Sequence, residues 1–169
     1  VSLPGYMTDT EIDQLQVQKA ANLISEAKRP LILAGHGVII SRTYSELMTL
    51  AEKAQIPVIT TLLGRSSFPD AHVLFVGMPG MHGVAYASLA IDEADLVIGL
   101  GMRFDDRITG DVASFAPNAK IIHIDIEPSE MGKNVATDIE VVGDLRAVFN
   151  HLNPLVQPKT HIEWLRRID

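Results

Sequence analysis

The sequence predicts an α/β fold in which a doubly wound, mostly parallel six-stranded sheet carries helices on both faces. Short apolar runs of strand length alternate along the chain with amphipathic stretches that are long enough to be crossover helices between parallel strands. Several of the apolar runs end in glycine or in charged residues, as strands do when they open onto a ligand crevice. Together these two observations indicate a Rossmann-like layout.

The first half of the chain supplies two strands and the helices beside them. Thr8 and Glu11 have the spacing of a capping box, and apolar residues then recur at helical intervals, which predicts a helix from about Thr10 to Ala27. Pro30 ends this helix. We expect the first strand over residues 31–34, an amphipathic helix over residues 42–55 and a second strand over residues 58–61.

The second half continues the alternation. A short third strand is expected over residues 73–76, and the glycine-rich string GMPGMHG that follows it leads into a helix with several small side chains. The apolar run over residues 96–100 has the character of a central, buried strand. Further strands are expected over residues 121–124 and 139–142, and Asp144 is expected to cap a short helix that runs through Asn150.

A chain of 169 residues is long enough for one domain and too short for two of ordinary size. Residues 1–9 contain Pro4-Gly5 and no periodic pattern, which predicts a linker that leads into the domain. The domain itself is expected over residues 10–153. Pro154 and Pro158 then mark an exit linker, and a short helix containing Trp164 completes the segment 154–169.

The composition excludes several classes of function. There are 14 basic and 21 acidic residues, and the resulting formal charge of −7 disfavours binding to nucleic acid. No apolar run approaches the length of a membrane span. The absence of cysteine excludes disulfides, thiolate catalysis and zinc–cysteine sites, and it fits a cytoplasmic protein. The six histidines have no metal-ligand spacing, so no metal site is predicted.

The string DLVIGLGMRFDDRITG places two arginines and two aspartates directly after the predicted central strand. Arginine forks match phosphate oxygens and can also lie flat on a ring, so Arg103 and Arg107 could hold a dinucleotide. The alternative is a solvated loop in which the arginines pair with the neighbouring Asp105 and Asp106. Both interpretations are open at this point.

Glycine at the strand ends favours a ligand that contains phosphate, because it lets backbone N–H groups approach an anion. Neither Gly35-x-Gly37 nor Gly99-x-Gly101 completes the G-x-G-x-x-G pattern, so the usual nicotinamide signature is absent. Asp125 follows Gly101 at the spacing of an acid that bonds a ribose hydroxyl. A helix cap for the turn that follows is an equally good interpretation of Asp125.

His82 stands at the start of a helix rich in small residues, where it could donate to a ligand. A lone histidine is more often a satisfied structural group, and this alternative carries the greater weight from the sequence alone. No G-x-S-x-G elbow is present, and no pair of nucleophile and base is recognisable. The sequence therefore assigns no catalytic residue.

Four strings, TTLLGRSSFPDAH, GMPGMHG, GMRFDDRITG and HIDIEPSEMGKNV, followed by VVGD, closely resemble the central domain of the catalytic subunit in the acetolactate synthase (acetohydroxyacid synthase) family. The resemblance covers nearly the whole chain. It implies a six-stranded parallel domain that binds FAD and bridges two thiamine-diphosphate domains of the same polypeptide. In this family the flavin has no net redox role in the main reaction.

The resemblance also implies the properties of the parent enzyme. That enzyme condenses two 2-ketoacids with decarboxylation in branched-chain amino acid biosynthesis, and it uses thiamine diphosphate and Mg²⁺ bound outside this chain. It forms a homo-oligomer and is expected to have a regulatory subunit. Its expected location is the cytoplasm, or a plastid or mitochondrion if the parent is eukaryotic.

Carried over by motif, the flavin contacts of the family fall on strand ends. The implied FAD-binding residues are Gly35, Gly37, Thr61, Leu62, Met81, His82, Gly101, Arg103, Arg107, Ile108, Asp125, Ile126, Gly143 and Asp144. Asp106 and Arg107 match positions near the substrate channel and the herbicide site. Two departures from the family pattern, His36 and the segment Arg65-Ser66-Ser67, bear on how the flavin sits.

The family's thiamine-binding G-D-G motif is absent from this sequence, as is the amino-terminal domain that carries the family's activating glutamate. We therefore expect an excised central domain that is inactive by itself. Two alternatives remain: a structural spacer domain that has no ligand when isolated, and a nicotinamide-nucleotide-binding domain on a similar sheet.

Overall fold

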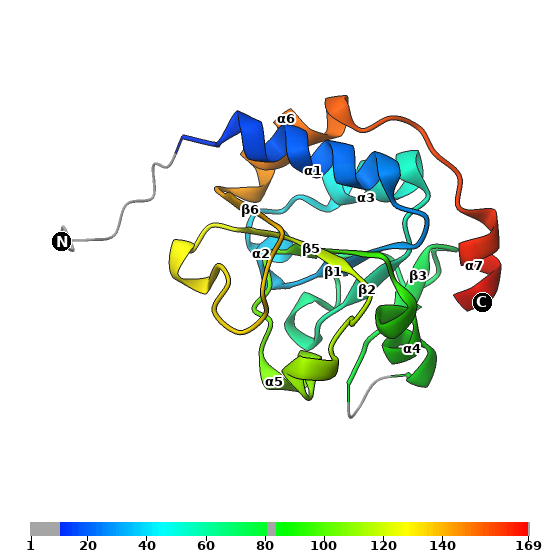
Figure 1. Cartoon of the computed structure of the whole chain (residues 1–169). Coiled ribbons are helices and arrows are strands. Elements are labelled where there is room, and N and C mark those ends of the chain that lie inside the picture. Colours follow the sequence, from blue (N-terminus) through cyan, green and yellow to red (C-terminus); the bar gives the residue numbers. More distant parts are fainter. Residues whose placement is uncertain (1–10, 81–83, 169) are drawn as a thin grey trace.

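The computed structural model describes residues 11–80 and 84–168 (Figure 1). Within this part of the chain, six parallel strands form a single sheet, which confirms the predicted α/β doubly wound fold. The strands are β1 (Pro30–Ala34), β2 (Val58–Thr60), β3 (Phe75–Gly77), β4 (Leu96–Leu100), β5 (Lys120–Asp125) and β6 (Ile139–Val142).

The order of the strands across the sheet is β3-β2-β1-β4-β5-β6. The chain builds outward from β1 to β3, then crosses back and builds outward from β4 in the opposite direction. The order therefore reverses between β1 and β4, which pair in register from Pro30 opposite Leu96 to Ala34 opposite Leu100. In open sheets of this kind the ligand crevice lies outside the carboxyl ends of the strands at this reversal.

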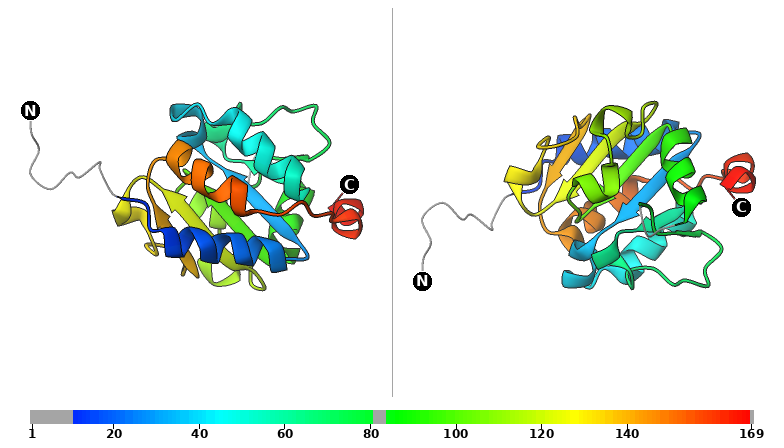
Figure 2. Two further views of the ribbon diagram at one scale, coloured as in Figure 1. Left: turned by 90° about the horizontal axis from the view of Figure 1, so that it is seen from above. Right: turned by 90° about the horizontal axis from the view of Figure 1, so that it is seen from below.

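Helices cover both faces of the sheet (Figures 1 and 2). One face carries α1, α3 and α6, which also pack against one another. The other face carries α4 and the short α5. The helices are α1 (Gln14–Glu26), α2 (His36–Ile40), α3 (Tyr44–Ala54), α4 (Ala85–Glu93), α5 (Asp106–Thr109), α6 (Leu145–Leu155) and α7 (Ile162–Ile168), with 3₁₀ turns η1 (Leu62–Gly64), η2 (Val112–Ser114) and η3 (Pro128–Glu130).

The core consists of two apolar clusters separated by the sheet. Side chains alternate along β1, so that Ile32 joins the cluster beneath α1, α3 and α6, while Leu31 and Leu33 join the cluster on the α4 side. Every residue of β1 and β4 is buried. Burial on both faces explains why these strands are continuous apolar runs without a polar alternation.

The starts of α1 and β3 differ from the prediction. Helix α1 begins at Gln14, because Asp13 accepts hydrogen bonds from the N–H groups of Leu15 and Gln16 at 2.9 and 3.2 Å. Thr8, which was expected to cap this helix, lies outside the described residues. Strand β3 begins two residues later than expected, at Phe75. The chain is still turning before this point, since the Phe75 N–H donates to the carbonyl of His72, and Val73 is 92% exposed.

The carboxyl-terminal part also differs. Helix α6 continues past Asn150 to Leu155 and holds Pro154 in its last turn. The apolar face of the helix remains buried as far as Leu152 and Val156, and this burial favours the extra turn over an early exit. The division of the chain at residues 153 and 154 stays a prediction.

Residues 159–168 pack back onto the domain at the amino ends of the strands. The Trp164 indole is 3% exposed and donates to the carbonyl of Pro30 at 2.9 Å. His161 is also buried, with its two ring nitrogens at 2.9 Å from the carbonyl oxygen of Ala54 and 3.1 Å from that of Ala27.

No helix in the described parts of the chain combines the length and apolar character needed to span a membrane.

Candidate functional site

The exits of β1 and β4 cross in direct backbone contact at the reversal of strand order. The Gly35 N–H donates to the carbonyl of Leu100, and the Gly37 N–H donates to the carbonyl of Gly101, both at 2.9 Å. A Cβ atom at Gly37 would lie only 2.6 Å from the Gly101 Cα, and Gly101 itself has a φ of +55°. Glycine is required here for the crossing of two backbones.

This geometry bears on the predicted role of Gly35 and Gly37. Their N–H groups are used within the protein, so these groups are not free to bind a phosphate. The two glycines join the β1 and β4 exits, and neither lines the cavity beside this junction. Their contact with a flavin stays a prediction.

A cavity of about 970 Å³ lies beside this junction at the carboxyl ends of the strands. Its walls come from the segments that leave β1, β2, β3, β4 and β5, and from one face of α4. It is lined by His36, Thr61, Leu62, Leu63, Met78, Pro79, Gly80, Ser88, Ile91, Asp92, Gly101, Met102, Arg103, Asp105, Asp106, Arg107, Ile108, Thr109, Gly110, Asp111, Ser114, Phe115 and Asp125.

Eight of the residues implied by the resemblance meet in this cavity, although they come from three separate segments of the chain. These are Thr61, Leu62, Gly101, Arg103, Asp106, Arg107, Ile108 and Asp125. Three others, Ile126, Gly143 and Asp144, do not line it. Met81 and His82 lie outside the described residues.

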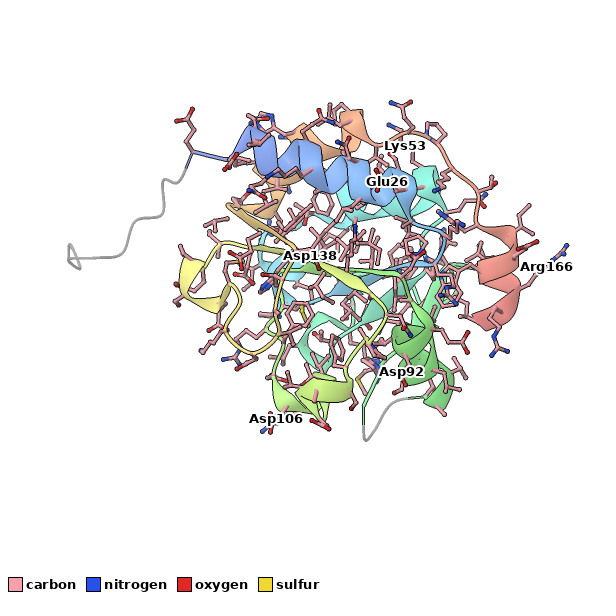
Figure 3. The ribbon with its side chains drawn as sticks, viewed as in Figure 1. Glu26, Lys53, Asp92, Asp106, Asp138 and Arg166 are labelled. Atoms are coloured by element: carbon pink, nitrogen blue, oxygen red, sulfur yellow. The ribbon has the colours of Figure 1, made fainter. Side chains whose placement is uncertain are left out.

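The two arginines of the cavity are available to a ligand. Within the described chain, Arg103 and Arg107 form no ion pair with Asp105 or Asp106, so the solvated loop of mutual pairs expected as the alternative is not observed. Both arginines are exposed at the cavity wall. Asp106 in α5 lies on the same side of the sheet as Asp92 in α4 (Figure 3).

Asp105 and Asp125 present acceptor atoms to the cavity. One carboxylate oxygen of Asp105, Oδ1, is buried and has no hydrogen-bond partner among the described residues. The Oδ1 atom of Asp125 accepts the N–H of Glu127 at 3.0 Å. Glu127 itself caps the following turn, η3, so a helix-capping role for Asp125 is not observed. The Ser129 hydroxyl and N–H lower the pKa of Glu127 and keep its carboxylate ionised beside the site.

Gly143 and Asp144 have a structural explanation. The Asp144 carboxylate accepts from the N–H groups of Arg146 and Ala147 at 3.0 and 3.3 Å and so caps α6. A Cβ at Gly143 would lie 3.1 Å from the Ile12 side chain, which packs across the start of α6. Their predicted flavin contacts stay predictions.

The sequence reasoning missed the wall formed by α4. Ser88, Ile91 and Asp92 line the cavity from one face of this helix. Their spacing of three and four residues is the signal that could have placed them together. His36, which departs from the family pattern, also lines the cavity, and its Nδ1 lies 2.9 Å from the carbonyl oxygen of Leu63.

A second, shallower cavity of about 680 Å³ lies between the first turn of α3 and the loop after η1. The departing segment Arg65-Ser66-Ser67 lines this second cavity and does not line the larger one. The segment therefore has no direct contact with the larger site in this structure.

Comparison with known proteins identifies the family. The family described as "Thiamine pyrophosphate enzyme, central domain" matches residues 17–152. The chain is 52% identical to a probable acetolactate synthase large subunit of Methanocaldococcus jannaschii, over 99% of this chain and 29% of that protein. It is 49% identical to an acetolactate synthase of Mycobacterium bovis, over 90% of this chain and 25% of that protein.

A third relative, the acetolactate synthase large subunit of Corynebacterium glutamicum, is 47% identical over 90% of this chain and 24% of its own length. The chain thus spans between about a quarter and three tenths of the relatives that it matches. Fold, strand-end motifs and comparisons agree, and the chain belongs to the thiamine pyrophosphate enzyme family, as a central domain of the acetolactate synthase type.

Proposed function

We propose that this domain binds FAD in the 970 Å³ cavity and bridges two thiamine-diphosphate domains in an acetolactate synthase. The observation that carries the flavin proposal is the convergence, at the reversal of strand order, of two arginines that form no ion pair among the described residues with the carboxylates of Asp105 and Asp125. A pyrophosphate needs cationic forks, and a sugar chain needs acceptors for its hydroxyl groups. The cavity offers both.

The residues present fit a flavin dinucleotide. Arg103 and Arg107 would hold the pyrophosphate oxygens, since guanidinium groups bind phosphate in a bidentate manner. Asp125, at the carboxyl end of β5, would accept a ribose hydroxyl. The buried Oδ1 of Asp105, which has no hydrogen-bond partner in the described part of the chain, would gain one from a ligand hydroxyl, which removes the cost of an unsatisfied buried acceptor.

Apolar walls complete the fit. Met102, Ile108 and Phe115 line the cavity and would exclude water from a flat ring. Gly80 has a φ of +93°, and a Cβ there would lie 2.8 Å from the carbonyl oxygen of Arg107. The segment that ends at Gly80 therefore packs closely on α5 and narrows the cavity. Bound FAD would supply this site with a ring and a diphosphate, with no net redox step in the main reaction.

The parent reaction is proposed from the relatives. We infer that the complete enzyme condenses two 2-ketoacids with loss of carbon dioxide, and that thiamine diphosphate and Mg²⁺ bind outside this chain. A homo-oligomer, a regulatory subunit, the branched-chain amino acid pathway and a cytoplasmic location belong to the same proposal. The relatives that support it carry the names acetolactate synthase and acetolactate synthase large subunit.

Thermal unfolding with FAD, with NAD or without ligand tests the binding proposal. FAD at about a hundred times its dissociation constant is expected to raise the free energy of unfolding by roughly 2.7 kcal/mol. Arg103→Gln should reduce this stabilisation, because it removes a cation from the cavity wall. Arg65→Gln is the matched control, since Arg65 lines the other cavity.

The two alternatives predict different outcomes. An equal or larger shift with NAD would favour a nicotinamide-nucleotide domain. The absence of any shift with FAD up to millimolar concentration would refute flavin binding by this chain and favour a structural spacer.

A further inference from the structure

His123 lies in the middle of β5, beneath the cavity, and it does not line the cavity. Its side chain is 1% exposed, and its Nε2 lies 2.8 Å from the carbonyl oxygen of Met102. Its Nδ1 has no hydrogen-bond partner among the described residues. A buried polar side chain in an apolar cluster costs free energy unless its hydrogen bond compensates. The bond to Met102 is therefore the feature of His123 that needs an explanation.

The geometry selects one tautomer of the neutral ring. If Nε2 carries the hydrogen, it donates to Met102, and only the Nδ1 lone pair is unused. If Nδ1 carries the hydrogen, a buried donor has no acceptor, and the Nε2 lone pair faces the carbonyl oxygen at 2.8 Å. The second arrangement is unfavourable on both counts. His123 therefore acts as a donor to the loop above it.

The loop that leaves β4 is held by contacts at three residues. The Gly101 N–H donates to the carbonyl of Ile124 at 2.8 Å. The Met102 carbonyl accepts from His123. The ring of Phe104 packs edge-on against the His123 ring, with centroids 4.9 Å apart.

The position of the Phe104 ring also depends on the residue opposite His123 in the sheet. Gly99 pairs with His123 in the register of β4 and β5. A Cβ at Gly99 would lie 2.8 Å from the Phe104 ring, so the missing side chain makes room for that ring. The Phe104 ring therefore packs against His123 and occupies the space that a side chain at Gly99 would fill.

The fixed points flank two charged residues that line the cavity. Arg103 stands between Met102 and Phe104, and Asp105 follows directly, so the backbone of both is determined by contacts with β5 and Gly99. Asp125, two residues along the same strand, has its Oδ2 only 4.0 Å from the His123 Nε2. We propose that His123 is a positioning residue. It donates to the Met102 carbonyl and packs against the Phe104 ring, and these two contacts orient Arg103 and Asp105 toward the dinucleotide.

This proposal rests on the proposed function, and two substitutions test it. His123→Phe keeps a ring of similar size and removes the donor. His123→Gln keeps an N–H group at the same number of bonds from the backbone and removes the ring. In the 169-residue chain, we expect His123→Phe to weaken FAD binding by about tenfold, the effect of one lost buried hydrogen bond. His123→Gln should recover part of that loss, because it restores the donor without the ring.

Ile121→Val is the matched control. Ile121 is buried in the same apolar cluster, on the same strand, and it does not line the cavity. This variant should lower stability and leave FAD affinity unchanged. A purely structural role for His123 would make His123→Phe behave in the same way as the control.

A measurement without ligand separates the two proposals. Hydrogen exchange of the Gly101 and Ile108 amides, which donate to the carbonyls of Ile124 and Asp105, should be faster in His123→Phe than in the wild type, and it should be unchanged in Ile121→Val. Unaltered exchange, or a His123→Phe variant that binds FAD as tightly as the wild type, would overturn the positioning role. Faster exchange in His123→Phe together with a wild type that does not bind FAD would overturn the proposed function and leave the role of His123 in ordering the loop.

Discussion

Individual glycines decide how closely the two halves of the sheet approach each other. Gly37 lies within α2, where alanine would ordinarily be the more stable residue by roughly 0.5–1 kcal/mol. Its Cα faces the Gly101 Cα, and a methyl group at this position would enter the space of the backbone leaving β4. The steric cost of this contact therefore opposes the gain in helix propensity. The sign of the change in the free energy of unfolding for Gly37→Ala shows which effect is larger.

We expect Gly37→Ala to lower the free energy of unfolding by about 1–3 kcal/mol, the usual cost of overpacking. Urea denaturation measures the change. Gly110→Ala is the control, because Gly110 has a φ of +57° and open space around its Cα. Because its ψ is −127°, outside the left-handed helical region, the variant should show only the cost of alanine in a glycine conformation, about 1–3 kcal/mol, without disturbing the junction. Stabilisation by Gly37→Ala would show that the backbone crossing is not tight.

The same residues show what could be predicted and what could not. The charges at Arg103 and Arg107 and the acid at Asp125 were predicted to converge, because the carboxyl ends of parallel strands share one edge. The requirement for glycine at Gly35 and Gly37 could not be predicted, because the atoms that impose it belong to Gly101, more than sixty residues away in the chain. A local pattern does not reveal which distant backbone it meets.

At the scale of elements, the ion pair between α4 and α7 joins the cavity wall to the last helix. Glu93 ends α4, and its carboxylate accepts two hydrogen bonds from the Arg167 guanidinium, at 2.7 and 3.0 Å. These hydrogen bonds, together with the charge of Arg167, lower the pKa of Glu93 below its ordinary value of 4.5. The ionised carboxylate thus contributes to stability.

The lowered pKa of Glu93 fixes the sign of the pH dependence. The stability that ionised Glu93 contributes is present above pH 4.5, and it is lost as the pH falls through the lower pKa of Glu93 in the folded state. We expect Glu93→Gln to be slightly less stable than the wild type at pH 7 and equal to it in more acidic solution. The measurement is the urea midpoint as a function of pH. Glu163→Gln, on the exposed first turn of α7, should follow the wild type at every pH.

Boundaries of elements were predicted less well than their order. The runs that became β1, β4 and β5 were predicted because each is apolar and long enough to be buried on both faces. The start of β3 was misplaced at Val73, since an apolar residue in a turn is indistinguishable by pattern from one in a strand. Helix α5 was also missed, because its four residues, beginning at Asp106, resemble a charged loop.

At the scale of the whole molecule, the order of the strands creates the site. The reversal between β1 and β4 leaves the segments after these strands free to diverge and enclose a cavity. The number of strands followed from the sequence, whereas the depth of the cavity depends on how α4 and α5 pack against the sheet. That packing is set by contacts between distant residues such as Gly80 and Arg107.

The chain alone is expected to be catalytically inactive. It spans less than a third of the relatives named acetolactate synthase, and the G-D-G motif for thiamine diphosphate is absent from its sequence. With pyruvate, thiamine diphosphate and Mg²⁺, we expect no acetolactate to form, as measured by colorimetric assay. A complete relative such as the Corynebacterium glutamicum protein serves as the positive control. Appreciable turnover by the 169-residue chain would refute the proposal that the catalytic groups lie elsewhere.

The docking of Trp164 and His161 has a consequence for how the domain is delimited. The family match stops at residue 152, yet the carbonyl oxygens of Ala27, Pro30 and Ala54 have partners that come from further along the chain. A version cut at the end of the match would expose the apolar residues that Trp164 covers and remove the side-chain contacts of these oxygens. We therefore expect a chain that ends at residue 152 to be less stable than one that extends to residue 168.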